Sequence, residues 1–96
     1  MPNYEGVFIL DAELTADATK AAVTQLQDLV TKNQGHIESL QEWGKKRLAY
    51  KIRKKAEGYY AVLNFQVESA GVKKIEQSLR LNDNVIRYLI VNKGAL

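Results

Sequence analysis

Residues 45–67 read KKRLAYKIRKKAEGYYAVLNFQV, and this stretch decides the fold class. Over residues 59–67, apolar and aromatic side chains recur at every second position, which is typical of a β-strand with one buried face. Residues 36–53 form a longer and more polar strand-like run, which we expect to bend at Gly44. Residues 54–58 lie between the two runs and predict a turn. The stretch therefore predicts a hairpin of two antiparallel strands.

The segments before this hairpin predict a strand and a helix. Residues 3–10 are rich in β-branched and aromatic types, which indicates a central strand. Apolar residues then recur at helical spacing over residues 14–30, and Thr15 is the predicted N-cap of this helix. We expect Gly35 to take the left-handed conformation that ends the helix.

The segments after the hairpin repeat the helix and the strand. Ser69 is the predicted N-cap of a second amphipathic helix, whose apolar stripe runs to Leu79, with Leu81 as a candidate extension. A turn at residues 82–84 leads into the last strand, residues 85–91.

The predicted order of elements is β-α-β-β-α-β within a single domain, residues 1–96. Two right-handed crossovers place both helices on the same face of a four-stranded antiparallel sheet. The fold class is therefore α+β, a ferredoxin-like βαββαβ sandwich with strand order 4-1-3-2. This order puts the cation-rich strand of residues 36–53 at an edge.

Alternation predicts which side chains face away from the helices. Where Leu63 and Phe65 face the helices, Tyr60 and Val62 face outward. Arg87 should avoid the core, and it carries its alternate neighbours on the last strand outward with it. These outward residues form either an apolar patch that receives a protein partner or an ordinary half-exposed sheet face. The predicted partner face consists of Tyr60, Val62, Arg87, Leu89 and Val91, with Val85 also expected to point outward.

The positive charge of this chain is concentrated in one segment. The net charge is only +3, from 14 cations and 11 acids. Residues 45–55 contain seven of the cations and no acid, and the rest of the chain carries seven cations against eleven acids, a net charge of −4. Such an asymmetry points to a polyanionic partner.

Several classes of site have no residues to build them. The chain has no cysteine and one histidine, His36, so we expect neither a metal site nor a cofactor. No serine lies in a Gly-x-Ser-x-Gly motif, and Gly44-Lys45 lacks the spacing of a phosphate-binding loop. No apolar run approaches the roughly 20 residues that span a bilayer. The first residues lack the basic start and apolar run of a signal peptide, so we do not expect one. We expect a cytoplasmic protein that is not an enzyme.

The cationic segment has two interpretations. Lysines often guard an edge strand against edge-to-edge aggregation. The number of cations, the absence of acids among them and the presence of Tyr50 favour phosphate binding, with Tyr50 able to stack on a base.

Two alternatives of other kinds stay open. An RNA recognition motif has the same order of elements and would stack unpaired bases on Tyr59 or Tyr60, although Glu57 departs from its third-strand pattern. A ferredoxin-like domain that binds a small regulatory ligand would need a pocket with convergent polar groups.

Three motifs also resemble one known family. They are Glu-Trp-Gly-Lys-Lys-Arg-Leu-Ala-Tyr at residues 42–50, Gly-Tyr-Tyr at residues 58–60, and Leu-Arg-Leu-Asn-Asp-Asn-Val-Ile-Arg-Tyr at residues 79–88. Together they resemble the bacterial small-subunit ribosomal protein S6 family, and the resemblance extends over the whole chain. It implies a ferredoxin-like fold, no catalytic activity and no cofactor.

The resemblance also implies the partners. Members of this family bind the central domain of small-subunit ribosomal RNA, in the platform region, together with the eighteenth protein of the small subunit. Arg80 and Arg87 lie in the third motif and are candidates for contact with RNA or with that protein. Combined with the cationic segment, the predicted RNA-binding residues are Lys45, Lys46, Arg47, Tyr50, Lys51, Arg53, Lys54, Lys55 and Arg80.

Two features depart from the family pattern. Lys51 stands where the family often has proline, which leaves the path into the following turn open. The C-terminal segment after the last predicted strand is short, so contacts made by longer tails are not expected.

Overall fold

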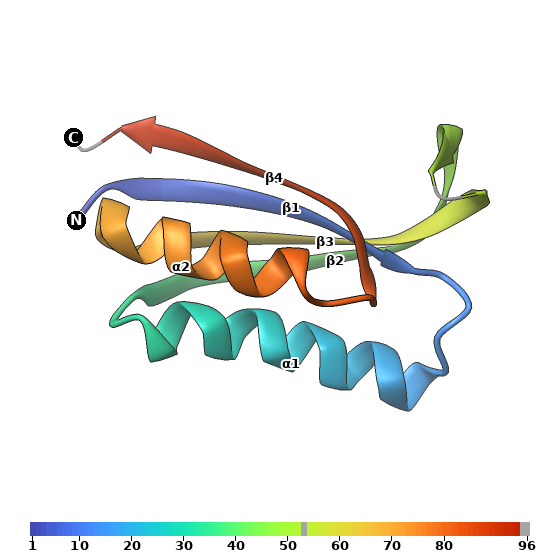
Figure 1. Ribbon diagram of the computed structural model, residues 1–96, viewed down its shortest axis with the longest axis horizontal. Coiled ribbons are helices and arrows are strands. Elements are labelled where there is room, and N and C mark those ends of the chain that lie inside the picture. The colour runs from blue at the N-terminus through green and yellow to red at the C-terminus, as the bar shows by residue number, and fades with distance from the viewer. Residues whose placement is uncertain (53, 95–96) are drawn as a thin grey trace.

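The computed structural model describes residues 1–52 and 54–94, and it contains the predicted elements in the predicted order. The elements are β1 (Asn3–Asp11), α1 (Ala16–Lys32), β2 (His36–Ile52), β3 (Lys55–Gln66), α2 (Ser69–Arg80) and β4 (Val85–Gly94). The strands form one antiparallel sheet in the order β2-β3-β1-β4, and both helices cover the same face (Figure 1). The predicted fold class, the strand order and the edge position of β2 are confirmed.

The main core lies between the helices and the sheet. Phe8 and Leu10 of the central strand β1 and Phe65 of its neighbour β3 are almost completely buried there. Leu26 of α1 and Ile75 of α2 close the core from the helix side. Each fully buried side chain of this size contributes about 1.5–3 kcal/mol, which is what holds the helices on the sheet.

Both ends of α1 have defined caps. The Thr15 hydroxyl accepts a hydrogen bond from the backbone N–H of Ala18 at 3.1 Å, as predicted for the N-cap. At the other end the prediction for Gly35 is wrong, because Gln34 takes the left-handed conformation (φ 62°). The backbone N–H of Gly35 instead bonds to the carbonyl of Val30, which completes a Schellman-type ending. A Cβ on Gly35 would lie 2.7 Å from the backbone oxygen of Gln66, so glycine is needed for close approach.

The start and end of α2 differ from the prediction. Glu68 occupies the N-cap position without a side-chain hydrogen bond, and Ser69 is already inside the helix. Leu81 is 85% exposed, so it does not extend the apolar stripe. The helix stops at Arg80, and the turn that follows carries Leu81 away from the core face.

The hairpin between β2 and β3 is longer than predicted. β3 begins at Lys55, so most of the predicted turn at residues 54–58 is strand, and the predicted placement is wrong there. Within the described residues the turn includes Lys54 in a left-handed conformation (φ 65°). The predicted bend at Gly44 is confirmed, since Gly44 has φ 81° and the pairing of β2 with β3 shifts register beside it.

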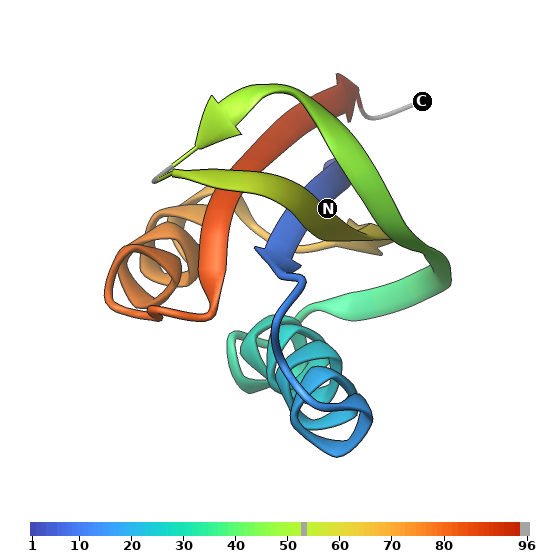
Figure 2. The same ribbon diagram turned by 90° about the vertical axis from the view of Figure 1, so that its right-hand side faces the viewer.

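This irregular pairing lets the end of the hairpin curl over the sheet. Figure 2 shows the last part of β2 arching over the face opposite the helices. Leu48 packs there against Ile9 of β1 and Ile86 of β4, and all three are buried. Ile52 and Tyr60 pack around this second cluster. The hairpin end is therefore anchored by its own apolar contacts and forms part of the folded body.

One prediction for β4 is wrong for a related reason. Val85 is buried in the main core, whereas alternation from Arg87 places it on the open face. The register of β1 with β4 shifts between the pairs Ile9–Arg87 and Leu10–Val85, which leaves Ile86 as the extra residue of a bulge. The bulge inverts the alternation at this point, so Val85 turns inward.

Candidate nucleic-acid interface

The hairpin end presents an exposed cationic surface. Leu48, in the middle of this segment, is buried against the sheet and fixes the backbone that carries the charges. The predicted residue Arg53 lies outside the described part of the chain. The exposed cations of the hairpin, which we call the basic hairpin surface, are Lys45, Lys46, Arg47, Lys51 and Lys54.

Tyr50 connects the hairpin to the opposite edge strand. Nη1 of Arg87 on β4 donates a hydrogen bond to the Tyr50 hydroxyl, and the Arg87 guanidinium carbon lies 5.8 Å from the centre of the Tyr50 ring. Tyr50 is still 61% exposed. Tyr50 was predicted to contact RNA, and Arg87 to contact RNA or the protein partner; the structure brings the two side chains together. Arg87 adds a cation beside the basic hairpin surface.

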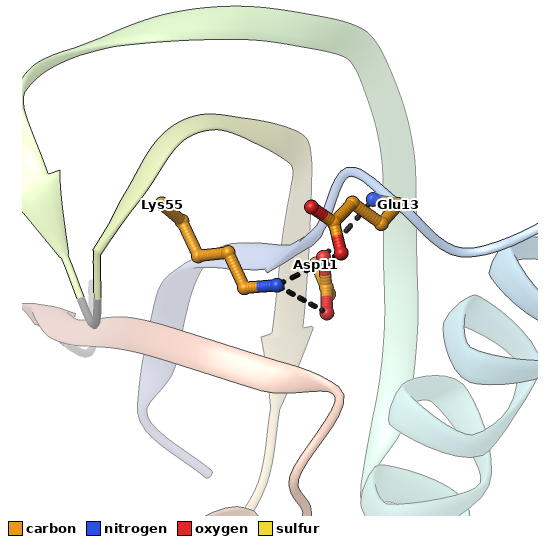
Figure 3. Close-up of polar contacts among 3 residues, drawn as sticks. All are labelled: Asp11, Glu13 and Lys55. Carbon is orange, nitrogen blue, oxygen red and sulfur yellow. Dashed lines mark hydrogen bonds and ion pairs between the residues drawn. The ribbon is translucent and has the colours of Figure 1, made fainter.

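Lys55 differs from the exposed lysines of the basic hairpin surface because its charge is already paired with acids. Figure 3 shows its side chain reaching the turn after β1, where Nζ lies 3.5 Å from Asp11 Oδ2 and 3.0 Å from Glu13 Oε2. Asp11 Oδ1 also accepts a hydrogen bond from the backbone N–H of Glu13, which orients the Asp11 carboxylate. The two acids clamp the start of β3 to the end of β1.

The clamp changes the protonation of Lys55 in a defined direction. The hydrogen bond that the Lys55 ammonium donates to Glu13, with the charges of both acids, raises the pKa of this ammonium above its ordinary value of 10.5. A raised pKa in the folded state means that the pair stabilises the fold at pH values below about 10.5. This contribution is lost as the pH rises through the folded pKa.

Arg80 lies apart from the basic hairpin surface. It is exposed in the last turn of α2, and its interaction with the Tyr88 side chain raises the pKa of the guanidinium. An arginine is cationic in any case, so Arg80 offers a second, isolated positive site.

The carboxylates and the histidine of β2 are surface groups. Glu38 accepts a hydrogen bond from Gln66 Nε2 at 2.8 Å, and Glu42 accepts one from the Tyr59 hydroxyl at 3.0 Å. Burial, with the bond to Glu42, raises the pKa of Tyr59. His36 is exposed.

The predicted partner face is only partly available. Leu89 and Val91 are 60% and 45% exposed on the open face of β4, as predicted. Val62 lies on the same face but is only 3% exposed, so its expected availability is wrong. Tyr60 is half-buried beneath the hairpin side of the sheet. The curled hairpin covers part of the open face, so the exposed apolar side chains of the predicted partner face are Leu89 and Val91 on β4.

Trp43 carries no predicted role, yet it is a prominent surface feature. Its side chain is 50% exposed and stacks on Tyr60, with ring centres 6.3 Å apart and planes inclined by 12°. The Lys46 ammonium lies 5.2 Å from the centre of the Trp43 ring. A tryptophan inside a polar, cation-flanked strand was the available sequence signal.

The residues that the structure describes also bear on two other possibilities, a metal site and a membrane-spanning helix. Residues 1–52 and 54–94 contain no group of three or more histidine or acidic side chains placed to hold a metal ion. Neither α1 nor α2 is long and apolar enough to cross a membrane.

Comparison with known proteins decides the family. The family model described as ribosomal protein S6 matches residues 3–92. The chain belongs to the ribosomal protein S6 family. Two bacterial relatives named small ribosomal subunit protein bS6 support this assignment. The relative from Moorella thermoacetica is 43% identical over 94% of this chain and 92% of its own length, and the relative from Clostridium novyi is 40% identical over 96% and 97%. The protein is therefore a component of the small ribosomal subunit.

Solved structures agree on the fold. The crystal structure of 30S ribosomal protein S6 from Thermotoga maritima superposes with a TM-score of 0.92 over 96% of this chain and 87% of that chain, at 22% identity. The C-terminal domain of the MgtC protein from Mycobacterium tuberculosis superposes with a TM-score of 0.64 at 10% identity. The second similarity illustrates that the fold by itself does not define a function.

Proposed function

We propose that this S6 family member is a non-catalytic RNA-binding protein that contacts the central domain of small-subunit ribosomal RNA through the basic hairpin surface. The observation that carries the proposal is the basic hairpin surface itself, whose five exposed cations are carried by a hairpin anchored to the sheet. Such a surface meets the requirement for phosphate contacts, namely several cations held on one rigid support.

The edge-guarding interpretation explains less of this pattern. Guarding lysines protect the free backbone edge of a strand. Here the cations continue into the turn at Lys54, and the hairpin end curls over the sheet away from the plane of the edge. Arginine and lysine at this position contact phosphates without reading base sequence, so specificity would come from RNA shape and from a protein partner.

We assign the protein partner to the open face on the β4 side. Leu89 and Val91 expose apolar surface there, and Arg87 supplies a cation between that surface and the hairpin. Exposed apolar side chains grouped in this way are typical of protein contact sites. The eighteenth protein of the small subunit is the expected occupant, so that both proteins hold the RNA together.

The RNA recognition motif is a weaker candidate. Its mechanism needs exposed aromatic rings on the open face of the central strands. Tyr59 packs against the helix-side core and bonds to Glu42, so it is not available on that face. Tyr60 lies on the open face but is half-buried and stacked against Trp43, so its ring is not exposed in the way that this mechanism needs.

Binding to a central-domain ribosomal RNA fragment, measured across a salt series with and without the eighteenth protein, tests the proposal. If about four to six phosphates are contacted, the log–log slope of affinity against salt should be roughly −3 to −5. Affinity should rise when the partner is present. Binding that does not respond to salt would refute the electrostatic mechanism.

The ion-pair clamp leads to a separate prediction for two lysines of the same hairpin. We expect Lys51→Gln to lower the magnitude of the salt slope by about one, as for one lost phosphate contact. Lys55→Gln should change the slope much less, because Asp11 and Glu13 already neutralise that ammonium. Equal loss from both variants, in the same RNA-binding assay, would show that the clamp opens when RNA binds.

A further inference from the structure

We propose that the exposed ring of Trp43, supported by Tyr60 and flanked by Lys46, is a stacking site for one unpaired nucleotide of the bound RNA. This inference rests on the proposed function and adds a contact to a base, where the basic hairpin surface supplies contacts to phosphates. Trp43 is one of the large apolar side chains that the fold leaves exposed, and it is the chain's only tryptophan.

The ring is held in a fixed orientation by three neighbours. Tyr60 of β3 stacks with it at nearly parallel planes, which is a favoured offset arrangement of aromatic rings. The indole Nε1–H donates to Gln41 Oε1 at 3.4 Å. The Lys46 ammonium lies within cation–π range, 5.2 Å from the ring centre. A base would meet a ring that is already ordered, so little conformational freedom is lost on binding.

The backbone of β2 explains why the ring is presented in this way. The pairing of β2 with β3 shifts register between Glu42 and Gly44, so Trp43 is the extra residue of a bulge. Gly44 has φ 81°, a conformation that glycine adopts without strain. The bulge places the indole beside Tyr60 on the open face, and the cationic residues follow immediately along the strand.

The relative strengths of the two contacts favour replacement of the Lys46 ammonium on the Trp43 ring by a nucleotide base. An exposed cation–π contact strengthens an interaction by roughly 2- to 5-fold, whereas a base stacked on an aromatic ring strengthens binding by roughly 5- to 150-fold. The ammonium displaced from the ring would remain close to the nucleotide, where it can pair with the phosphate. The base therefore occupies the ring and Lys46 turns from the ring to the phosphate.

The charge around the ring selects a nucleotide over an apolar protein side chain. The Lys46 ammonium lies over the ring, and a nucleotide combines a flat ring with a negative phosphate. An apolar protein side chain could also pack on the ring, but it would leave the Lys46 charge against apolar surface. Every base has a π-face, so we expect stacking that tolerates any base identity.

The test uses the full chain, its single tryptophan and a central-domain ribosomal RNA fragment. We expect Trp43→Ala to weaken RNA binding by roughly 5- to 150-fold with an unchanged salt slope, because no phosphate contact is lost. Trp43→Phe should recover most of the affinity, since it keeps an aromatic face. In the wild-type protein, RNA should quench the fluorescence of Trp43. Urea unfolding of both variants shows whether they are folded under the assay conditions.

The outcomes separate this site from the proposed function. Equal affinity of folded Trp43→Ala and wild type, with the salt slope intact, would overturn the stacking site alone. Fluorescence quenching by the eighteenth protein without RNA, and none by RNA, would assign the ring to the protein partner and also overturn it. A wild-type protein that shows no salt-dependent binding would overturn both proposals.

Discussion

The triple variant Lys45→Glu, Arg47→Glu and Lys51→Glu should bind small-subunit ribosomal RNA on the order of 100-fold more weakly than wild type at about 0.1 M salt. Each lost phosphate contact removes about 0.7–0.9 from the magnitude of the log–log salt slope, so three lost contacts remove about 2–3. All three side chains are exposed on the basic hairpin surface, so the core should be unaffected. Fluorescence anisotropy of labelled RNA across a salt series measures both quantities.

A matched control separates position from total charge. Lys32, Lys73 and Lys74 are exposed on the two helices, on the side of the molecule opposite the curled hairpin. Their triple reversal to glutamate changes the net charge by the same amount. It should lower RNA affinity far less and leave most of the salt slope in place. Similar losses in the two triple variants would mean that overall charge, not the hairpin, governs binding.

Shortening Leu48 to alanine should destabilise the protein by about 2 kcal/mol, at the lower end of the range for buried leucines. Leu48 is only 9% exposed and fills the small cluster with Ile9 and Ile86 that holds the hairpin end on the sheet. Its loss leaves a cavity beneath the strand that carries the RNA-binding cations. Urea unfolding followed by circular dichroism measures the change, and RNA affinity should fall although no charge is altered.

Leu81→Ala is the control for this prediction. Leu81 has the same side chain but is 85% exposed, so its truncation should change the free energy of unfolding by no more than about 0.5 kcal/mol. A Leu48→Ala protein as stable as Leu81→Ala would show that the hairpin end does not pack on the sheet in solution.

Local pattern was sufficient to predict the architecture. The switch between period-two and helical spacing defined six elements, and their order left one reasonable sheet topology with β2 at the edge. The N-cap at Thr15 and the bend at Gly44 were predictable because each depends on a residue type acting within a few positions.

Features that depend on tertiary contacts were not predictable. The bulge at Ile86 inverted the alternation and buried Val85, although the residues around it show no break in pattern. Gln34 takes the left-handed position, while Gly35 is needed for close approach to Gln66 at the end of β3.

For the candidate interface, too, the positions of the cations were predictable from the sequence, but their contacts with distant residues were not. The residues of the basic hairpin surface were found from composition alone, because all five lie within ten consecutive positions, residues 45–54. The pairing of Lys55 with Asp11 and Glu13 and the contact of Tyr50 with Arg87 join residues about 40 positions apart. Sequence pattern carries no information on such pairs, and for Lys55 the pairing changes the expected role.

Directed probing of ribosomal RNA from the hairpin tests the central claim most directly. The chain contains no cysteine, so Lys51→Cys provides a unique attachment point for a tethered iron–EDTA group, and Lys74→Cys on α2 provides the control. We predict that the probe at residue 51 cleaves the RNA of the reconstituted small subunit within its central domain, and that the probe at residue 74 cleaves it weakly or not at all. Central-domain cleavage from residue 74 with none from residue 51 would contradict the assignment of the basic hairpin surface as the RNA-binding surface.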